Sequence, residues 1–278
     1  MDRLRWDLGG STWGFFRQDN ESAWVPVSEA VRTVVGSGLG VEIWPTRNLH
    51  GPDPSDAELE SIRQAAGDAP FASVHIRGRY WRWSPTDLRR EIDFTAEVGA
   101  RTLVIHPASL GLTEPRDRLD AEEVTRIADY GADRGVRFAL ENIRNASWAL
   151  DRVLDEIGDD PERTNVAVCI DVGHAFLSDD LGVQPIHGYL ERYRSQLAHL
   201  HLHDNAGIED DHIPPGDGGI DWRDLLRVLD EFGFAGTAIL EVARCGEDAP
   251  RTIDESVRFL RSLARRLEEG GAQSRVSK

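Results

Sequence analysis

Side chains that bind cations recur in this sequence at the ends of short apolar runs, and four of them share that position: Glu141, Asp171, His201 and Glu241. An oxygen-rich set with one imidazole nitrogen suits Mn²⁺, Co²⁺, Mg²⁺ or Zn²⁺. Three carboxylates brought together without a cation repel one another, and the repulsion forces protonation. The residue types therefore predict a site for one divalent metal ion.

Two more histidines, His75 and His106, lie at the ends of further apolar runs, so six such residues fall at the ends of six different expected strands. Alternation along a strand places His199, His201 and His203 on one face. Of these, we expect His199 to be a packed core residue. Asp204 alternates to the opposite face, so we expect its replacement to be much milder than replacement of Glu241.

Glu42 and several tryptophans are further candidates for contact with a substrate. Glu42 lies in another apolar run and could either bind a substrate hydroxyl or support the residues around the metal ion. Trp13, Trp81 and Trp83 fall in two loops rich in aromatic residues. Aromatic faces line ligand sites and exclude water, although these side chains could equally pack on one another or form a subunit contact.

Short apolar runs recur about every 30 to 35 residues, which is the length of one strand–helix unit. The expected strands are Leu4–Leu8, Val41–Trp44, Ala72–Ile76, Thr102–His106, Phe138–Glu141, Val166–Ile170, Ala198–His203 and Ala238–Val242. Apolar residues spaced three and four apart in residues 88–98 and 220–232 predict helices between them. Such alternation forms either one closed parallel barrel or one long doubly wound sheet.

The placement of the polar residues favours the barrel. The C-terminal ends of all strands of a barrel converge on one mouth, where active sites form, whereas an open sheet would spread the same residues along a line. We therefore predict an α/β protein with a single (β/α)₈ TIM barrel as its catalytic domain over residues 1–269. Residues 270–278 are expected to form a disordered tail.

The amino-acid composition limits which partners the protein could bind and in which cellular compartment it is expected. With 32 Lys and Arg against 49 Asp and Glu, the formal net charge is −17, which argues against nucleic acid as a partner because phosphate backbones bind basic surfaces. The only lysine is Lys278, which excludes Schiff-base chemistry in the folded body. Two cysteines, no long apolar run and no signal-peptide pattern predict a cytoplasmic protein without a membrane segment.

Six segments occur in a fixed order along the chain: Ile-His106-Pro, Leu-Glu141-Asn, Cys-Ile-Asp171-Val-Gly-His174-Ala-Phe, His201-Leu-His-Asp204, Asp210-Asp-His212 with Gly216-Asp-Gly218, and Leu-Glu241. Taken together, they resemble the xylose isomerase-like TIM barrel superfamily. That superfamily holds sugar isomerases and epimerases, inosose dehydratases and the endonuclease IV type of apurinic endonuclease. The resemblance extends from the third expected strand to the eighth.

The resemblance implies a ligand set and a range of metal content. The metal ligands common to the sugar-active members match Glu141, Asp171, His201 and Glu241. The additional zinc ligands of the endonucleases match His75, His106, His174, Asp210 and His212, which implies up to three Zn²⁺ ions in that branch. Many sugar-active relatives keep several of these histidines as substrate contacts, and relatives suggest a homo-oligomer.

The function that this pattern favours is a divalent-metal-dependent isomerase or epimerase of a sugar or polyol. Glu141 and Glu241 would pass a proton through an enediolate, one removing it and the other returning it. An inosose dehydratase-like lyase needs the same enolate and stays open. A zinc-dependent apurinic endonuclease-type phosphodiesterase is favoured by the additional ligands and opposed by the net charge. A barrel that binds a sugar without converting it is a further alternative.

Overall fold

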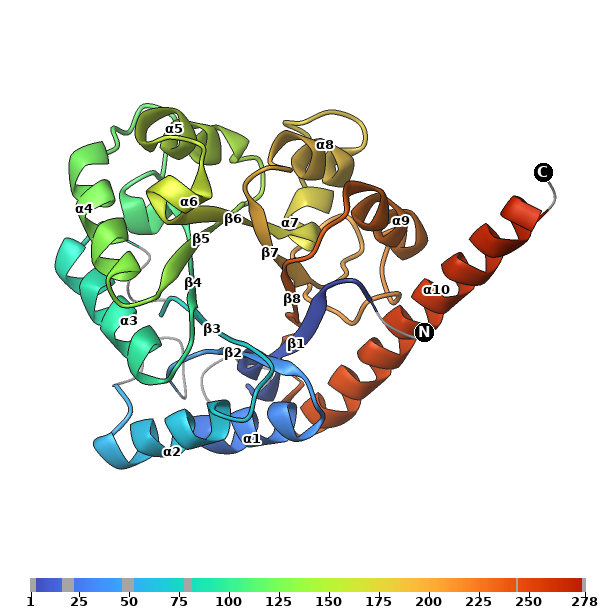
Figure 1. Cartoon of the computed structure of the whole chain (residues 1–278), viewed down its shortest axis with the longest axis horizontal. Helices are drawn as coiled ribbons and strands as arrows, with labels where there is room; N and C mark the ends of the chain where they lie inside the picture. Colours follow the sequence, from blue (N-terminus) through green and yellow to red (C-terminus); the bar gives the residue numbers. More distant parts are fainter. Residues whose placement is uncertain (1–3, 17–22, 47–52, 78–81, 244, 277–278) are drawn as a thin grey trace.

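Eight parallel strands close into a barrel in which each strand pairs with the next along the chain and β8 pairs with β1 (Figure 1). The computed structural model describes residues 4–16, 23–46, 53–77, 82–243 and 245–276. The strands are β1 (Asp7–Ser11), β2 (Gly40–Ile43), β3 (Ala72–His75), β4 (Thr102–Ile105), β5 (Arg137–Glu141), β6 (Val166–Asp171), β7 (Leu197–Leu202) and β8 (Thr237–Leu240). This topology confirms the predicted (β/α)₈ barrel.

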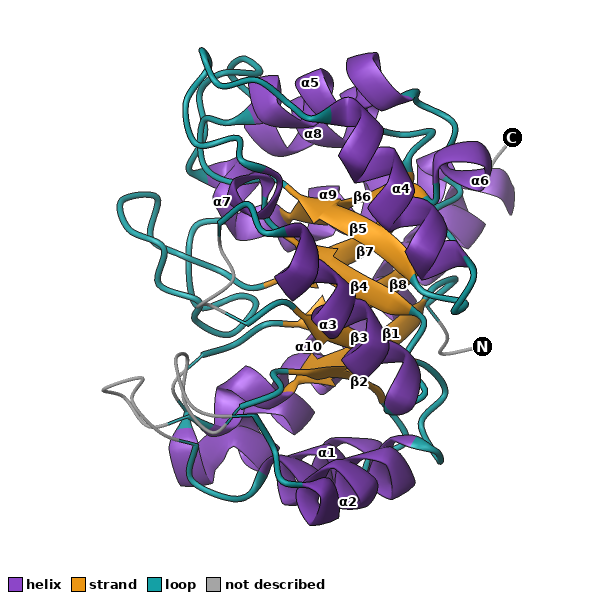
Figure 2. Ribbon diagram, turned by 90° about the vertical axis from the view of Figure 1, so that its left-hand side faces the viewer, coloured by secondary structure: helices purple, strands orange, loops and turns teal. Residues whose placement is uncertain are grey.

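Helices follow the strands and surround them (Figures 1 and 2). The α-helices are α1 (Val27–Gly36), α2 (Asp56–Ala66), α3 (Pro85–Glu97), α4 (Ala121–Ala132), α5 (Ser147–Ile157), α6 (Pro161–Thr164), α7 (Val172–Phe176), α8 (Pro185–Arg192), α9 (Trp222–Phe232) and α10 (Ala249–Val276). Short 3₁₀ helices are η1 (Thr12–Phe15), η3 (Pro107–Leu110) and η4 (Gly246–Asp248).

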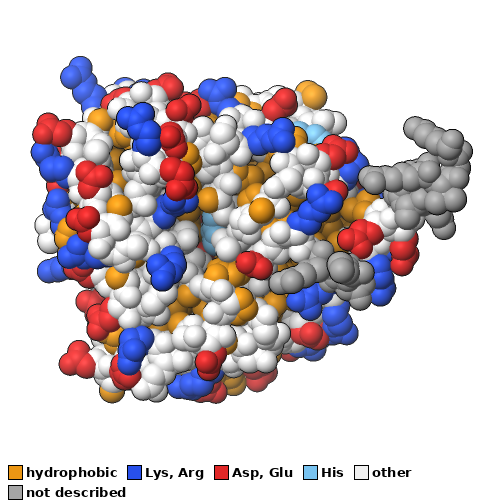
Figure 3. Space-filling view, viewed as in Figure 1, with side chains coloured by type: hydrophobic (Ala, Val, Ile, Leu, Met, Phe, Trp, Pro, Cys, Tyr) orange, Lys and Arg blue, Asp and Glu red, His pale blue; other side chains and the backbone are white. Residues whose placement is uncertain are grey.

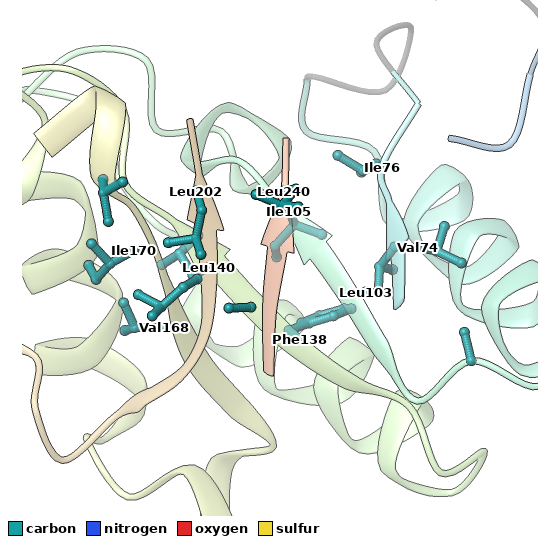
Figure 4. Packing of buried hydrophobic residues seen from close by; sticks show 14 of the residues in the cluster. Val74, Ile76, Leu103, Ile105, Phe138, Leu140, Val168, Ile170, Leu202 and Leu240 are labelled. Atoms are coloured by element: carbon teal, nitrogen blue, oxygen red, sulfur yellow. The ribbon is translucent and has the colours of Figure 1, made fainter. Parts of the chain in front are cut away.

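The main hydrophobic core lies between the strands and the helices. Buried residues at alternate positions of neighbouring strands contribute to it, and Figure 4 labels ten of them: Val74, Ile76, Leu103, Ile105, Phe138, Leu140, Val168, Ile170, Leu202 and Leu240. Because successive side chains of a strand point to opposite faces, the residues between these positions face the interior of the barrel. The positions of these outward-facing apolar residues therefore determine which residues of each strand point into the barrel and toward its mouth.

Helix α9 shows how local sequence sets the limits of these elements. The Asp221 side chain accepts a hydrogen bond from the backbone N of Asp224 and so caps the first turn. Leu225 and Leu229, four residues apart, are buried against the core, and burying such a side chain contributes about 1.5–3 kcal/mol. Gly233 ends the helix in the left-handed conformation, with φ of 69°.

The first strand begins later than predicted. The expected strand is Leu4–Leu8, whereas β1 runs Asp7–Ser11 and includes Gly9. Glycine is depleted in strands. A prediction from apolar residues alone therefore ends the strand at Leu8, before Gly9 and Gly10, which belong to β1. A Cβ atom at Gly9 would lie 2.7 Å from the carbonyl oxygen of Gly40. The glycine is therefore required by the close approach of β1 and β2.

Helix α10 continues past the predicted domain boundary. It runs Ala249–Val276 and projects beyond the ring of helices (Figure 1). The helix thus covers most of the segment expected to be a disordered tail, and the boundary at residue 269 stays a prediction. None of the helices in the described ranges, α10 included, combines the length and apolar character that spanning a membrane requires.

The interior of the barrel has its own small core. Val104, Ala139 and Cys169 form a hydrophobic cluster separate from the main one. Buried polar side chains, Glu42 and His199 among them, share this interior. The space below the mouth is therefore filled partly by polar residues that must find partners there.

Candidate metal centre

Four side chains from the ends of the adjacent strands β5 to β8 converge at the mouth: Glu141, Asp171, His201 and Glu241. One ligand atom from each lies within 4.8 Å of the others, and all four residues are buried. His201 Nδ1 lies 3.2 Å from Glu241 Oε2, 3.5 Å from Glu141 Oε1 and 3.7 Å from Asp171 Oδ2. We call these residues the metal group.

Strand register sets this arrangement. Asp171 of β6 is the register partner of His201 of β7, and Glu141 of β5 pairs with Cys169, two residues before Asp171. The side chain of Asn142 holds the end of β6. Its Oδ1 accepts a hydrogen bond from Asp171 N at 2.7 Å, and its Nδ2 donates to Asp171 O at 3.1 Å. Both backbone polar groups of Asp171 are therefore held by Asn142, and this fixes the position from which the Asp171 side chain extends.

Two carboxylates of the metal group, those of Glu141 and Asp171, stay ionised despite their burial. Burial alone would raise the pKa of Glu141, but the imidazoles of His201 and His106 outweigh it and hold that pKa well below its usual range. Burial also opposes the ionisation of Asp171, yet His174 lowers its pKa to about 2. Anionic oxygens at neutral pH are the form in which carboxylates bind a cation.

Two atoms of the metal group lack hydrogen bonds. Glu141 Oε2 and His201 Nδ1 are buried and make none within the described part of the chain. A buried polar atom without a hydrogen bond costs about 1–3 kcal/mol, and a cation would offset that cost at both atoms. Their donor chemistry, an oxygen and an imidazole nitrogen, fits Mn²⁺, Co²⁺, Mg²⁺ or Zn²⁺.

Glu141 also belongs to a second group, with His75 and His106. His106 Nε2 lies 3.1 Å and His75 Nε2 lies 3.4 Å from Glu141 Oε2. The ligand atoms of these three residues lie within 4.8 Å of one another. Trp44 stacks on His75, with ring centroids 4.3 Å apart and planes 8° from parallel. The aromatic ring thereby fixes the orientation of this imidazole.

A third group adjoins Asp171 and consists of His174, His203, Asp210 and His212. Asp210 Oδ2 lies 3.0 Å from Nε2 of both His174 and His212. His203 Nε2 lies 2.9 Å from Asp171 Oδ1, and its ring stacks on that of His212 at 3.7 Å. The five residues predicted as second-metal or substrate contacts therefore fall into two groups, each of which touches the metal group.

His212 has an unusual backbone conformation. Its φ of 47° lies in the left-handed region, which residues other than glycine seldom adopt. Its Nδ1 lies 3.0 Å from the carbonyl oxygen of Glu241, and its own carbonyl accepts a hydrogen bond from Ala243 N. Such strain persists where the surroundings over-determine it. It turns the ring toward His174, with centroids 5.9 Å apart, and leaves His212 buried.

Asp204 anchors the loop that carries His212. Its carboxylate is fully buried and accepts hydrogen bonds from Gly216 N at 3.0 Å, Ile220 N at 3.1 Å and Trp222 Nε1 at 2.7 Å. Alternation does turn Asp204 away from the metal group. Because the carboxylate joins both ends of the loop, its replacement should weaken the loop, and the smaller effect expected here than at Glu241 stays a prediction.

The tryptophans predicted as substrate contacts have different surroundings. Trp13 borders the site, where it stacks on Trp44 at 4.9 Å and meets His212 edge-on at 4.6 Å. Trp83 is half-buried and packs against the main hydrophobic core, an arrangement that favours a structural role over contact with substrate. Trp81 lies outside the described residues.

Glu42, also predicted as a substrate contact, lies behind His201. Its Oε1 is 3.1 Å from His201 Nε2, while the other ring nitrogen of His201 faces the metal group. Glu42 is fully buried, and so is His199, whose Nε2 lies 3.2 Å from Glu42 Oε2. This placement argues against contact with a substrate and favours the alternative that Glu42 supports the residues around the metal ion.

His203, Trp44 and Asn142 belong to the site although the sequence gives them no definite role. Alternation contains a signal for two of them, since His203 shares a face with His201 and Trp44 shares a face with Glu42. The sequence contains no such signal for the role of Asn142, because its hydrogen-bond partner is the backbone of Asp171, 29 residues later in the chain.

Comparison with known proteins links the chain to one family of barrels. A sequence model of the xylose isomerase-like TIM barrel family matches residues 38–263. An uncharacterised protein of Methanocaldococcus jannaschii is 26% identical over 188 residues, or 62% of each chain, which is less than two thirds of that relative. Fructoselysine 3-epimerase of Shigella flexneri is 24% identical over 251 residues, 82% of this chain and 89% of the relative. Inosose dehydratase of Serratia proteamaculans is 26% identical over 145 residues, 44% and 46% of the two chains.

Solved structures share the architecture. A protein of Thermus thermophilus, solved after soaking with ZnCl₂, has a TM-score of 0.64 and 25% identity and covers 93% of this chain and 98% of its own. D-Psicose 3-epimerase of Clostridium cellulolyticum, solved with D-tagatose, has a TM-score of 0.68 and 15% identity, with 93% and 99% coverage. At this lower identity the likeness shows the fold alone.

Proposed function

Because the chain belongs to the xylose isomerase-like TIM barrel family, we propose that it is a divalent-metal-dependent isomerase or epimerase of a sugar or polyol. The observation that carries the proposal is the metal group, whose four buried ligand atoms lie within 4.8 Å of one another. The similarity to fructoselysine 3-epimerase over 82% of the chain supports it.

In the proposed reaction, two glutamates would transfer the proton. A divalent cation held by the metal group would supply Lewis-acid stabilisation of the negative charge that develops on the substrate oxygens. Glu141 and Glu241 lie 3.5 and 3.2 Å from the same nitrogen, His201 Nδ1, and approach it from β5 and from the end of β8. One carboxylate removes the proton from the carbon between a carbonyl and a hydroxyl group. The other returns it, to the opposite face in an epimerase or to the neighbouring carbon in an isomerase.

The surrounding residues would orient the substrate and exclude water. His174 is held by Asp210 and by the carbonyl oxygen of Asn142, which lies 2.9 Å from its Nδ1. Both ring nitrogens are thereby occupied, so a direct hydrogen bond from Nε2 to a substrate hydroxyl would require that hydroxyl to replace Asp210. Trp13 offers an aromatic face at the border of the site. The partner that this arrangement suits is a small sugar or polyol.

The experiment that tests the proposal is exchange of substrate C–H for deuterium. The protein is purified without chelators, its metal content is measured, and a panel of ketoses and keto-inositols is followed by NMR in D₂O. We expect exchange at the carbon next to a carbonyl group for at least one sugar, and loss of that exchange after treatment with EDTA. Absence of exchange across the panel in the metal-loaded protein would contradict the proposal.

A zinc phosphodiesterase acting on abasic DNA is the second candidate, and the two additional histidine groups favour it. The net charge of −17 opposes it, because affinity for DNA comes largely from neutralising phosphates with Lys and Arg. Basic and acidic side chains are interspersed over the face shown in Figure 3. Three bound zinc ions together with cleavage of an abasic duplex would establish this alternative, whereas one ion and proton exchange would exclude it.

A lyase remains close to the leading proposal in chemistry. Inosose dehydratase is a partial relative, and dehydration of a keto-inositol begins with the same loss of a proton next to a carbonyl group. The two reactions differ in whether a hydroxyl group then leaves. The panel distinguishes them, because a lyase yields a dehydrated product while an epimerase returns an isomer of equal mass.

A further inference from the structure

Glu42 is a fully buried carboxylate whose hydrogen-bond partners in the described ranges are two imidazoles and one hydroxyl group. Its Oε2 makes hydrogen bonds with His199 Nε2 at 3.2 Å and with His201 Nε2 at 3.4 Å. Its Oε1 lies 3.1 Å from His201 Nε2 without meeting hydrogen-bond geometry there. Ser73 Oγ donates a hydrogen bond to Oε2 at 2.9 Å. The mechanism proposed above makes no use of this carboxylate, although isolated buried carboxylates are rare in proteins unless they are paired.

The two nitrogens of the His201 ring have different partners. Nδ1 faces the carboxylates of the metal group, and Nε2 faces Glu42. A neutral imidazole has one protonated nitrogen and one nitrogen with a free lone pair. If Nδ1 is to bind a cation, the proton must lie on Nε2, where Glu42 can accept a hydrogen bond from it.

We infer that Glu42 is a positioning residue for the metal ion, which acts by holding His201 as the Nε2-protonated tautomer with Nδ1 directed into the metal group. This inference rests on the proposed metal site. A carboxylate behind a ligating histidine fixes the orientation of the ring and raises its basicity, and loss of such a partner typically weakens metal affinity about 10- to 100-fold.

The carboxylate of Glu42 is itself held in place. Ser73 on β3 donates to it, and His199 on β7 contacts the same oxygen from across the barrel. His199 is in turn fixed by Thr237 on β8, whose Oγ1 lies 2.6 Å from His199 Nδ1. The interior therefore contains a continuous chain of polar contacts from Thr237 to His201, which explains why the barrel keeps polar residues below its mouth.

The test compares metal affinity in three proteins: wild type, Glu42→Gln and Glu91→Gln. Affinity for Zn²⁺ and Mn²⁺ is measured by competition with a chelator at constant pH. We expect Glu42→Gln to bind about 10- to 100-fold more weakly than wild type. Glu91 is the matched control, because it is an equally buried glutamate that pairs with Arg77 at another place, and Glu91→Gln should keep wild-type affinity.

Two further measurements separate positioning from folding. Circular dichroism of the metal-free proteins shows whether each variant is folded, and ¹⁵N NMR of the zinc-loaded proteins reports which nitrogen of His201 carries the proton. We expect protonated Nε2 in wild type and a loss of that preference in Glu42→Gln. Ser73→Ala keeps both Glu42 and His201 but removes one anchor, and should weaken affinity in the same direction by a smaller factor.

The outcomes are distinct. Equal metal affinity in wild type and folded Glu42→Gln, with an unchanged His201 tautomer, would overturn this inference and leave the proposed function standing. A wild-type protein that binds no divalent cation at all would overturn the proposed function and the inference with it.

Discussion

Glu241 has two roles in the proposed chemistry, and they can be separated by one substitution. Its carboxylate lies 3.2 Å from His201 Nδ1 and 3.7 Å from His212 Nδ1. Glu241→Gln keeps the shape and one oxygen but removes the charge and the ability to accept a proton. We expect metal affinity to weaken somewhat, and the rate of deuterium exchange to fall by about two to four orders of magnitude, as for loss of a general base.

The control for this substitution is Glu247→Gln. Glu247 is an exposed residue of η4, a few residues further along the chain and outside the three groups of the site. Its replacement should leave both metal affinity and exchange rate unchanged. Exchange at the wild-type rate in Glu241→Gln would remove Glu241 from proton transfer and leave Glu141 as the carboxylate candidate.

His174 contributes to the pH dependence of the metal-free protein. Burial opposes its charge, but Asp171, Asp210 and Glu141 outweigh burial and raise the pKa of His174 well above its ordinary value of 6.5. A raised pKa in the folded state stabilises the protein below the unfolded pKa, and this contribution is lost as pH rises through the folded value. The metal-free protein should therefore become less stable as pH rises above about 6.5.

Thermal unfolding between pH 6 and pH 9 in EDTA checks this expectation. His174→Asn should flatten the decline. Added Zn²⁺ or Mn²⁺ should reverse the trend, because a cation competes with protons for the same ligands. A decline that persists unaltered in His174→Asn would show that other groups cause it.

At the scale of an element, the loop between β7 and α9 depends on Asp204. An amide in place of this carboxylate would present N–H hydrogens to groups that are themselves donors, Gly216 N, Ile220 N or Trp222 Nε1. Leaving buried donors unsatisfied costs about 1–3 kcal/mol, and more when the lost partner is charged. We expect Asp204→Asn to lower the melting temperature by several degrees and to reduce turnover, because Asp210 and His212 lie on this loop.

The same change at Asp217 provides the control. Asp217 lies on the same loop but is exposed, so Asp217→Asn should leave melting temperature and turnover close to wild type. Melting curves and exchange rates for the two variants give the comparison. If Asp204→Asn behaves like Asp217→Asn, the carboxylate does not anchor the loop.

The limits of prediction from this sequence are also clearest at the scale of elements. Apolar runs that end in a carboxylate or imidazole predict the barrel and the convergence of its polar residues, because the ends of all parallel strands meet at one mouth. Alternation along β7 correctly separates the histidine face from Asp204. It cannot show that Asp204 is tied to Trp222, or that Gly9 belongs to β1, because both depend on contacts between segments distant in the chain.

At the scale of the whole molecule, metal binding should stabilise the fold. A ligand that binds only the native state at about 100 times its dissociation constant contributes about 2.7 kcal/mol. For a domain of this size that corresponds to a rise in melting temperature of roughly 5 °C. Calorimetry with EDTA and then with excess Mn²⁺, Co²⁺, Mg²⁺ or Zn²⁺ measures the shift.

Asp171→Asn serves as the comparison for this stabilisation. Loss of one anionic ligand should reduce the metal-dependent shift sharply, whatever the variant does to the melting temperature of the metal-free protein. The shift, and not the absolute melting temperature, is therefore the quantity to compare. A wild-type protein whose melting temperature is the same with EDTA and with each cation would contradict the metal site.

The barrel keeps its two hydrophobic clusters apart, and this separation bears on how such a protein can change over evolution. The outward cluster holds the strands to the helices, while Val104, Ala139 and Cys169 form a cluster of their own inside. Residues that face the mouth can be exchanged without disturbing the outer packing on which most of the fold depends. A lineage built on this plan can acquire or lose a histidine group, and with it a substrate range, through substitutions that leave this outer packing in place.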